Sequence, residues 1–243
     1  MKSFVVGASA GLGRALSEEL ARRGHDLVLL ASDERDVLAL TRDLALTHGV
    51  KTYPLAADLA NIDAARLRAD HSEAFGDLDN IFVVAGFSDI TDTGSLEPGL
   101  LERLIATNFT GAVRIVNAVL DDIAAQPNGH IVGVGSVAAI RARRSNIVYG
   151  ASKRALEFYF EALRHRLAGS RCRVQFYRAG YMATNMLGDR TTLLPVARPE
   201  RVAQAIINRM GGPSGVRYLP AWWRWVALVF RLVPWPIFRR FDV

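Results

Sequence analysis

The sequence has little cysteine and no long uninterrupted apolar run, and each shortage excludes a class of protein. A single thiol, Cys172, cannot form a disulfide within the chain, which excludes a disulfide-stapled extracellular scaffold. The most apolar stretch, 222–238, is interrupted by arginine and proline. It therefore cannot supply the about 20 apolar residues of a membrane-spanning helix. The N-terminus lacks the apolar length and cleavage site of a secretory signal, so we expect a cytoplasmic protein.

Concentrated charge and metal-ligand spacing are also missing. The formal net charge is +6, and because Lys2, Lys51 and Lys153 are the lysines, arginine carries the basicity. The arginines are scattered until the last quarter of the chain, which argues against a nucleic-acid partner. The histidines, 5 in number, are scattered as well, and no Walker A lysine occurs. We expect no metal site.

What the chain does contain is a regular alternation of strand and helix patterns over 243 residues, a length that one α/β domain can have. Strand patterns lie at 3–7, 26–30, 51–57, 80–84, 130–134, 173–177 and 216–219, and helical patterns at 12–23, 33–47, 64–75, 100–123, 149–168 and 199–210. The strands are apolar without strict alternation, as in parallel sheets covered on both faces. We predict an α/β fold: a Rossmann-type, doubly wound, seven-stranded parallel sheet flanked by helices, with residues 1–243 in a single domain.

A glycine-rich turn links the first strand to the first helix. Residues 7–13 read GASAGLG. The pyrophosphate of a dinucleotide needs backbone N–H groups at a helix N-terminus and a close approach to the backbone, which side chains would block. Glycine is favoured in any tight turn, so the spacing alone is weak. Its place after an N-terminal strand indicates cofactor binding by Gly7, Ser9, Gly11, Leu12 and Gly13.

A phenol and an ammonium stand one helical turn apart at Tyr149 and Lys153. A tyrosine with a pKa of about 10 exchanges protons poorly at neutral pH, and a nearby positive charge favours its ionised form. In isolation this pair is more often a packed tyrosine and a surface lysine. Ser136, at the carboxyl edge of the predicted fifth strand, adds a hydroxyl that can hold a substrate carbonyl while Tyr149 donates to it.

With these motifs the chain resembles the classical short-chain dehydrogenase/reductase (SDR) family over essentially its whole length. The resemblance implies an NAD(P)-dependent oxidoreductase that interconverts a ketone and a secondary alcohol by hydride transfer, with Tyr149 as the acid/base. It implies Asn108 as the fourth catalytic residue, whose backbone carbonyl holds a water linked to Lys153. The alternative is a dinucleotide-binding sensor or scaffold without turnover.

The resemblance also implies the remaining cofactor contacts, which are Ser32, Asp58, Leu59, Ala85, Gly86, Tyr149, Lys153, Gly180 and Thr184. Asp58 has an alternative role as a helix cap, which Asn61 equally supplies. The chain departs from the family at Val6, at Val83-Val84 and at Ala179, where threonine, two asparagines and proline are usual. Either NAD or NADP is expected: Asp33 gives a slight lean to NAD, while Arg14 and Arg35 are candidates for a 2'-phosphate.

Two segments indicate a bulky or apolar substrate. The loop 181–197 is the substrate lid in the family, and its apolar residues are Met182, Met186, Leu187, Leu193 and Leu194. The tail 221–243 mixes tryptophan with arginine, as interfacial membrane segments do, although a helix packed on the protein or a partner is the alternative. Arg141, Arg143 and Arg144 are candidates for phosphate, or simply solvated surface.

The tail and the arginine run are together similar to the reductases that act on a decaprenylphosphoryl 2-keto-pentose. This narrower resemblance implies a lipid-linked sugar substrate and peripheral membrane contact through 221–243, at the inner face of the membrane. The helical pattern after Tyr149 has more apolar positions than one core-facing stripe needs, at Leu156, Phe158, Tyr159, Phe160 and Leu163. We therefore expect a homodimer or homotetramer.

Overall fold

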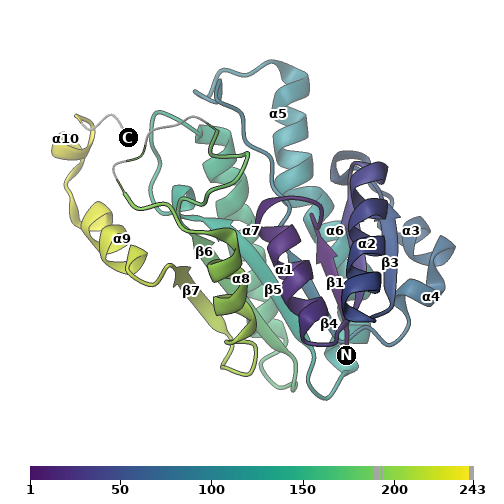
Figure 1. Cartoon of the computed structure of the whole chain (residues 1–243). Coiled ribbons are helices and arrows are strands. Elements are labelled where there is room, and N and C mark those ends of the chain that lie inside the picture. Colours follow the sequence, from purple (N-terminus) through teal and green to yellow (C-terminus); the bar gives the residue numbers. More distant parts are fainter. Residues whose placement is uncertain (189–191, 193, 241–243) are drawn as a thin grey trace.

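The computed structural model, which describes residues 1–188, 192 and 194–240, contains the predicted parallel sheet (Figure 1). Its strands are β1 (Lys2–Val6), β2 (Asp26–Ala31), β3 (Thr52–Ala56), β4 (Asn80–Val83), β5 (His130–Ser136), β6 (Arg173–Ala179) and β7 (Gly215–Leu219). They form a 7-stranded sheet in the order β3-β2-β1-β4-β5-β6-β7, and each neighbouring pair is parallel. The Rossmann-type prediction is confirmed.

Helices cover both faces of this sheet because each strand sends successive side chains to opposite sides. Phe4 and Val6 of β1 pack in one core with α6 (Gly111–Ala125) and α7 (Ile147–Arg166). Val5 packs in the other core with α1 (Gly11–Arg22), α2 (Glu34–His48) and α8 (Pro199–Ile207). Figure 1 shows these two helical layers on either side of the strands. Such double coverage explains the apolar strand patterns.

Two predicted helices are interrupted. The pattern 64–75 is α3 (Ala64–Asp70) followed by α4 (Ser72–Phe75), because His71 leaves helical geometry with φ −126° and ψ 44°. The pattern 100–123 starts earlier, at Pro98, and consists of α5 (Pro98–Ile105), the π-helical turn η2 (Ala106–Thr110) and α6. A π-turn inserts one extra residue, which apolar spacing alone does not reveal.

Strand β5 is two residues longer than its sequence pattern, which places Ser136 at its last position. Gly133 and Gly135 dilute the pattern, but the ring atoms of Phe160 and Phe176 occupy the space beside them. An added Cβ would lie 2.6 Å from Phe160 at Gly133 and 2.5 Å from Phe176 at Gly135. The glycines therefore let α7 and β6 approach β5 closely.

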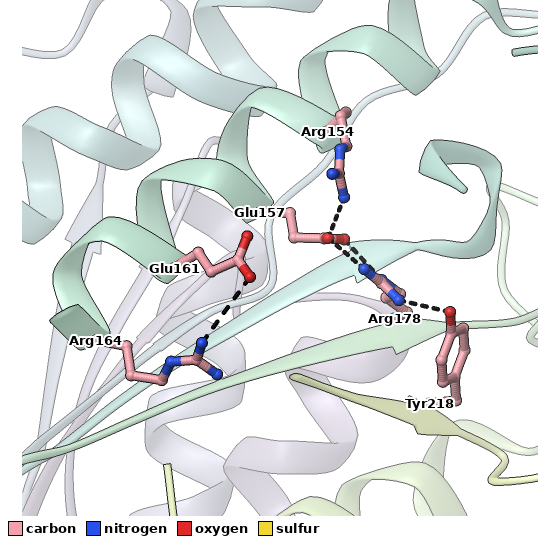
Figure 2. Close-up of polar contacts among 6 residues, drawn as sticks. All are labelled: Arg154, Glu157, Glu161, Arg164, Arg178 and Tyr218. Atoms are coloured by element: carbon pink, nitrogen blue, oxygen red, sulfur yellow. Dashed lines mark hydrogen bonds and ion pairs between the residues drawn. The ribbon is translucent and has the colours of Figure 1, made fainter. Parts of the chain in front are cut away.

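A buried ion pair fastens α7 to the sheet (Figure 2). Glu157, 1% exposed, accepts hydrogen bonds from Arg178 of β6, with Nε at 2.8 Å, and from Arg154 of its own helix. Arg178 also donates to the Tyr218 hydroxyl of β7 at 2.5 Å. This chain of contacts fixes the middle of α7 against the two last strands.

Beyond β7 the chain continues as α9 (Trp223–Leu232) and α10 (Trp235–Phe238), which lie at the β7 edge of the molecule in Figure 1. Two short 3₁₀ turns, η1 (Leu59–Asn61) and η3 (Val137–Ala139), complete the described elements. Among the described residues, no helix has both the length and the apolar character that crossing a bilayer requires.

Candidate active site

A cavity of about 840 Å³ opens at the carboxyl edge of the sheet. Ser136 at the end of β5, Tyr149 in the first turn of α7, and Gly180 and Thr184 after β6 all line it. These residues come from three parts of the sequence and meet because parallel strands end at the same edge. Most of the remaining lining is apolar and comes from the segment 135–146, from the loop after β6 and from the tail.

Lys153 is buried one turn along α7 from Tyr149. Its side chain is 3% exposed, and Nζ donates to the Ala85 carbonyl at 3.0 Å. Burial lowers the pKa of Lys153 from 10.5 to about 8. Gly86 makes this position accessible, because an added Cβ there would lie 2.8 Å from Nζ.

Asn108 is fully buried in the π-turn η2, where the amide clamps the segment after β4. Its Oδ1 accepts from the Phe87 N–H at 2.7 Å, and its Nδ2 donates to the Phe87 carbonyl at 2.7 Å. The Asn108 side chain thus uses its amide oxygen and nitrogen in hydrogen bonds to the Phe87 backbone. A chemical role for Asn108 would fall to its backbone carbonyl, the group that the family resemblance implies.

The two hydroxyls of the candidate site face the cavity with defined partners. Ser136 Oγ accepts from the Ala138 N–H at 3.1 Å, which leaves its proton available for donation. The Tyr149 hydroxyl donates to Met186 Sδ at 3.9 Å, so the loop 181–197 reaches the phenol. Leu193, which the sequence analysis assigned to this loop, lies outside the described residues.

The glycine turn forms a cradle at the start of α1. Gly7 has φ 89°, and an added Cβ at Gly13 would lie 1.8 Å from the Gly7 carbonyl, so neither position accepts a larger residue. Ala10, the N-cap of α1, makes no side-chain hydrogen bond to the helix. The first N–H groups of α1 are therefore not capped by Ala10 and suit an anionic ligand.

Other predicted cofactor residues adjoin this cradle. An added Cβ would lie 2.9 Å from Thr184 Cγ2 at Gly11 and 2.7 Å from Ala85 Cα at Gly7. Ser32 is exposed beyond the end of β2, while Ser9 is half-buried in the turn itself.

Three aspartates cap the starts of helical elements. Asp33 accepts from the N–H groups of Arg35 at 2.9 Å and Asp36 at 3.2 Å at the start of α2. Asp58 accepts from the Ala60 N–H at 2.9 Å, directly before buried Leu59. The next helix, α3, is capped by Asp63, so the alternative cap at Asn61 is wrong.

The tail forms one wall of the cavity. Trp223, 2% exposed, lies over Gly180, where an added Cβ would be 1.8 Å from the indole nitrogen. Val226, Ala227 and Phe230 continue this wall. One face of α9 is therefore packed on the protein, as the alternative for the tail predicted.

Two arginines of the run 141–144 hold the tail in place. Arg141 donates to the Phe230 and Val233 carbonyls, the latter at 2.6 Å, and its guanidinium lies 3.8 Å over the Phe238 ring. Arg144 donates to the Arg239 carbonyl at 2.9 Å. Their assignment as phosphate ligands is therefore not supported; Arg141 and Arg143 both line the cavity, but Arg141 is held by the tail carbonyls.

Sequence reasoning missed the contributions of Asp92 and Trp223. Asp92, 1% exposed, accepts from the Tyr149 N–H at 2.8 Å across 57 residues of sequence. Composition groups Trp223 with an interfacial tail. Neither position belongs to a local motif, so only the tertiary structure brings them to the site.

Known proteins resemble the chain along most of its length. A family model described as short chain dehydrogenase matches residues 2–193. An uncharacterized oxidoreductase of Myxococcus xanthus is 35% identical over 195 residues, covering 79% of this chain and 76% of the relative. One of Streptomyces coelicolor is 31% identical over 248 aligned positions, covering 99% and 95%. The structure of a short-chain dehydrogenase from Sphingobium yanoikuyae in complex with NADPH has a TM-score of 0.84 and 28% identity, covering 94% of this chain and 91% of that one.

Proposed function

This chain belongs to the short-chain dehydrogenase family and is an NAD(P)-dependent oxidoreductase, and we propose that it interconverts a ketone and a secondary alcohol with Tyr149 as the acid/base. The observation that carries the proposal is the joint placement of Ser136 and Tyr149 on one cavity, with Lys153 buried one helical turn along α7 from Tyr149. The alternative, a dinucleotide-binding sensor without turnover, needs no such grouping.

Each residue has a distinct task in the proposed reaction. Ser136 donates a hydrogen bond to the substrate oxygen and holds the carbonyl beside Tyr149. Tyr149 donates its phenolic proton to that oxygen during reduction and takes it back during oxidation. The Lys153 ammonium stabilises the phenolate, and the Asn108 carbonyl holds a water through which the proton is replaced.

The cradle fits a nicotinamide dinucleotide, which supplies or accepts the hydride when bound. The tight turn that Gly7 and Gly13 allow and the N–H groups at the start of α1 suit the pyrophosphate. We assign Ser9, Gly11, Leu12, Ser32, Asp58, Leu59, Ala85 and Gly86 to the rest of the cofactor, and Gly180, Thr184, Tyr149 and Lys153 to its nicotinamide and ribose end.

Substitution of Tyr149 by phenylalanine tests the reaction. Tyr149→Phe keeps the ring and removes the proton, so we expect turnover of a reactive diketone to fall by about a thousandfold or more, in the range that acid–base catalysis contributes. Cofactor affinity should remain within about twofold. Unchanged turnover would refute the assignment of Tyr149, and wild-type cofactor binding without turnover on any ketone panel would favour the sensor.

The preferred dinucleotide remains a proposal, with a lean to NAD. Asp33 supports it as the carboxylate at the end of β2, although one oxygen already caps α2 and the other reaches Arg35 at 3.4 Å. Arg14 and Arg35 are 56% and 91% exposed and would serve NADP instead. We expect a larger melting shift with NAD than with NADP at equal concentration. A larger shift with NADP would reverse the lean.

We assign a bulky or apolar substrate, with a lipid-linked sugar as the specific candidate. The apolar tail wall supports this, because Trp223, Val226 and Phe230 offer no hydrogen bond acceptor to a small polar substrate. Residues 181–197 act as the lid of a single domain spanning 1–243. Arg143, half-buried at the cavity rim, is the arginine of the run best placed for an anionic group on such a substrate.

The outer face of the tail supports peripheral membrane contact at the inner face of a cytoplasmic membrane. Its apolar side chains are exposed: Trp225 58%, Leu228 46%, Val229 59%, Leu232 72%, Trp235 64% and Ile237 52%. Arg224, Arg231, Arg239 and Arg240 surround them and are exposed too. Each basic residue near an anionic surface contributes about 1 kcal/mol. Indole rings favour the headgroup region, so this face suits an anionic bilayer.

Vesicle co-sedimentation tests the contact without removing the cavity wall. The wild-type protein should pellet with anionic vesicles of phosphatidylglycerol, and the double variant Trp225→Ser with Leu232→Ser should remain in the supernatant. Leu46→Ser, at an 87% exposed leucine on α2, is the matched control and should pellet like the wild type. Equal recovery of all three in the supernatant would leave the outer face without a lipid role.

A further inference from the structure

The first turn of α7 receives its cap from a distant loop. Asp92 lies between β4 and α5, and its Oδ1 accepts from the Val148 N–H at 3.0 Å while its Oδ2 accepts from the Tyr149 N–H at 2.8 Å. The Asp92 carbonyl also accepts from the Asn146 N–H at 2.7 Å. Three bonds from one residue therefore hold the start of the helix that carries the phenol.

This cap supplies hydrogen-bond acceptors that the start of α7 lacks. The first N–H groups of any α-helix lack partners within it. Asn146, the N-cap of α7, has φ 55°, in the left-handed region, and makes no side-chain hydrogen bond to the helix. Asp92 supplies the missing acceptors, and its negative charge is favourable at the positive end of the helix dipole.

The Asp92 carboxylate that caps α7 lies in the interior of the protein. Asp92 is 1% exposed, and among the described residues no lysine or arginine forms an ion pair with it. A buried charge of this kind requires hydrogen bonds to offset its lost hydration. The N–H groups of Val148 and Tyr149 provide these hydrogen bonds. The carboxylate can therefore be buried only at this helix start, and the helix start is held in place by the carboxylate.

We propose that Asp92 is a positioning residue for the reaction, which fixes where Tyr149 stands relative to a substrate on Ser136. The inference rests on the proposed function, because it takes Tyr149 as the acid/base. The same loop contributes Ser88 and Ile90 to the cavity. Asp92 thereby joins the part of the wall that touches the substrate to the backbone of the residue that exchanges the proton.

The test replaces the carboxylate by an amide. In Asp92→Asn one oxygen still accepts, but the NH₂ group faces the second helix N–H, donor against donor. We expect the rate of hydride transfer to benzil, a bulky diketone, to fall by about tenfold or more, since small misplacements of reacting groups are costly. The isotope effect with deuterated cofactor should rise toward its full value, and the cofactor dissociation constant should stay within about twofold.

Asp89→Asn is the matched control. Asp89 lies in the same loop and undergoes the same loss of charge, but its carboxylate accepts from the N–H and hydroxyl of Thr91 at 2.8 and 2.6 Å. It should transfer hydride at the wild-type rate. All rates are compared well below the melting temperature of each variant, so that a loss of stability alone does not lower them.

Amide hydrogen exchange provides a readout that does not depend on turnover. Val148 and Tyr149 should exchange faster in Asp92→Asn than in the wild type and in Asp89→Asn. If Asp92→Asn does not fold, Asp92→Ser, whose hydroxyl can accept one N–H, is measured in the same way. If Asp92→Asn transfers hydride at the wild-type rate, or if Val148 and Tyr149 exchange in it as in the wild type, the proposal is overturned. If the wild-type protein binds cofactor but reduces no ketone, that result counts against the proposed function. Amide hydrogen exchange at Val148 and Tyr149 would still show whether Asp92 holds the start of α7.

Discussion

The burial of Lys153 lowers the stability of the fold, although the proposed reaction needs its charge. Its ammonium is buried with the Ala85 carbonyl as a partner, and its pKa is lowered from 10.5 to about 8. Near neutral pH the group is charged in both the folded and the unfolded chain. Burying it therefore costs about 3 kcal/mol by the free energy that such a shift represents.

We predict that Lys153→Met makes the cofactor-free protein more stable while abolishing turnover. The methionine removes the buried charge but leaves the Ala85 carbonyl without its donor, so the gain near pH 7 should be about 1–3 kcal/mol. Urea denaturation measures it. Lys51→Met, at an exposed lysine, is the control and should change the free energy of unfolding by less than about 0.5 kcal/mol.

The lowered pKa of Lys153 also predicts how the stability gained in Lys153→Met changes with pH. The folded pKa of Lys153 lies below its unfolded value, so the burial cost is fully present below about 8 and disappears as the pH rises toward 10.5. The stability difference between Lys153→Met and the wild type should therefore shrink across this interval. A difference that is constant from pH 7 to pH 10 would contradict the buried ammonium.

At this scale, sequence reasoning identifies residues that belong to local patterns. Tyr149 and Lys153 are four residues apart, and the glycines of 7–13 follow a strand, so their spacing carries the information. Asp92 reaches Tyr149 through a loop with no regular period, and Asp33 and Asp58 cap local turns whether or not a cofactor is present. A residue whose partner is distant in sequence leaves no local signal.

Among the elements, α7 depends on the buried pair that Figure 2 shows. We predict that Glu157→Gln lowers the free energy of unfolding by about 3–5 kcal/mol, because it leaves the Arg178 guanidinium buried without its carboxylate. Glu161→Gln is the matched control on the same helix: its ion pair with Arg164 is 3.9 Å long, with both side chains more than 40% exposed. That substitution should cost less than about 1 kcal/mol, and equal losses would contradict the prediction.

The elements themselves were predicted well where side-chain period decides them. All seven strands fall within two residues of their patterns, since parallel strands buried on both faces read as short apolar runs. The failures lie where a backbone irregularity interrupts a continuous pattern. The break at His71 and the π-turn at 106–110 change the number of residues per turn without changing which residues are apolar.

For the whole molecule, the apolar surface beside α7 predicts self-association. Phe158 is 69% exposed, and Leu101 and Ile105 of the adjoining helix α5 are 37% and 41% exposed. We propose that a second copy covers this surface, giving a homodimer or homotetramer. Light scattering at micromolar concentration should show the oligomer for the wild type and a monomer for Phe158→Arg.

Leu46→Arg, on the far helix α2, controls for the added charge and should keep the wild-type mass. A wild-type monomer would refute the prediction. At this scale the sequence indicated an excess of apolar positions on the helix, but not which of them the protein's own core would cover. Leu156, Phe160 and Leu163 are buried in the core, Tyr159 is half-buried against it, and Phe158 is exposed.

The wall that α9 adds to the cavity has a consequence for how this protein can diversify. The segment follows the last strand, and no strand pairing among the described residues involves it. Changes at Val226, Ala227 and Phe230 would therefore reshape the space for the substrate while the glycine cradle and the Tyr149–Lys153 pair stay as they are, whereas Trp223 packs on Gly180 and has to be kept. We expect a chimera that keeps Trp223 and exchanges the rest of this segment, together with its Arg141 anchor, to change the range of substrates while the hydride chemistry stays the same.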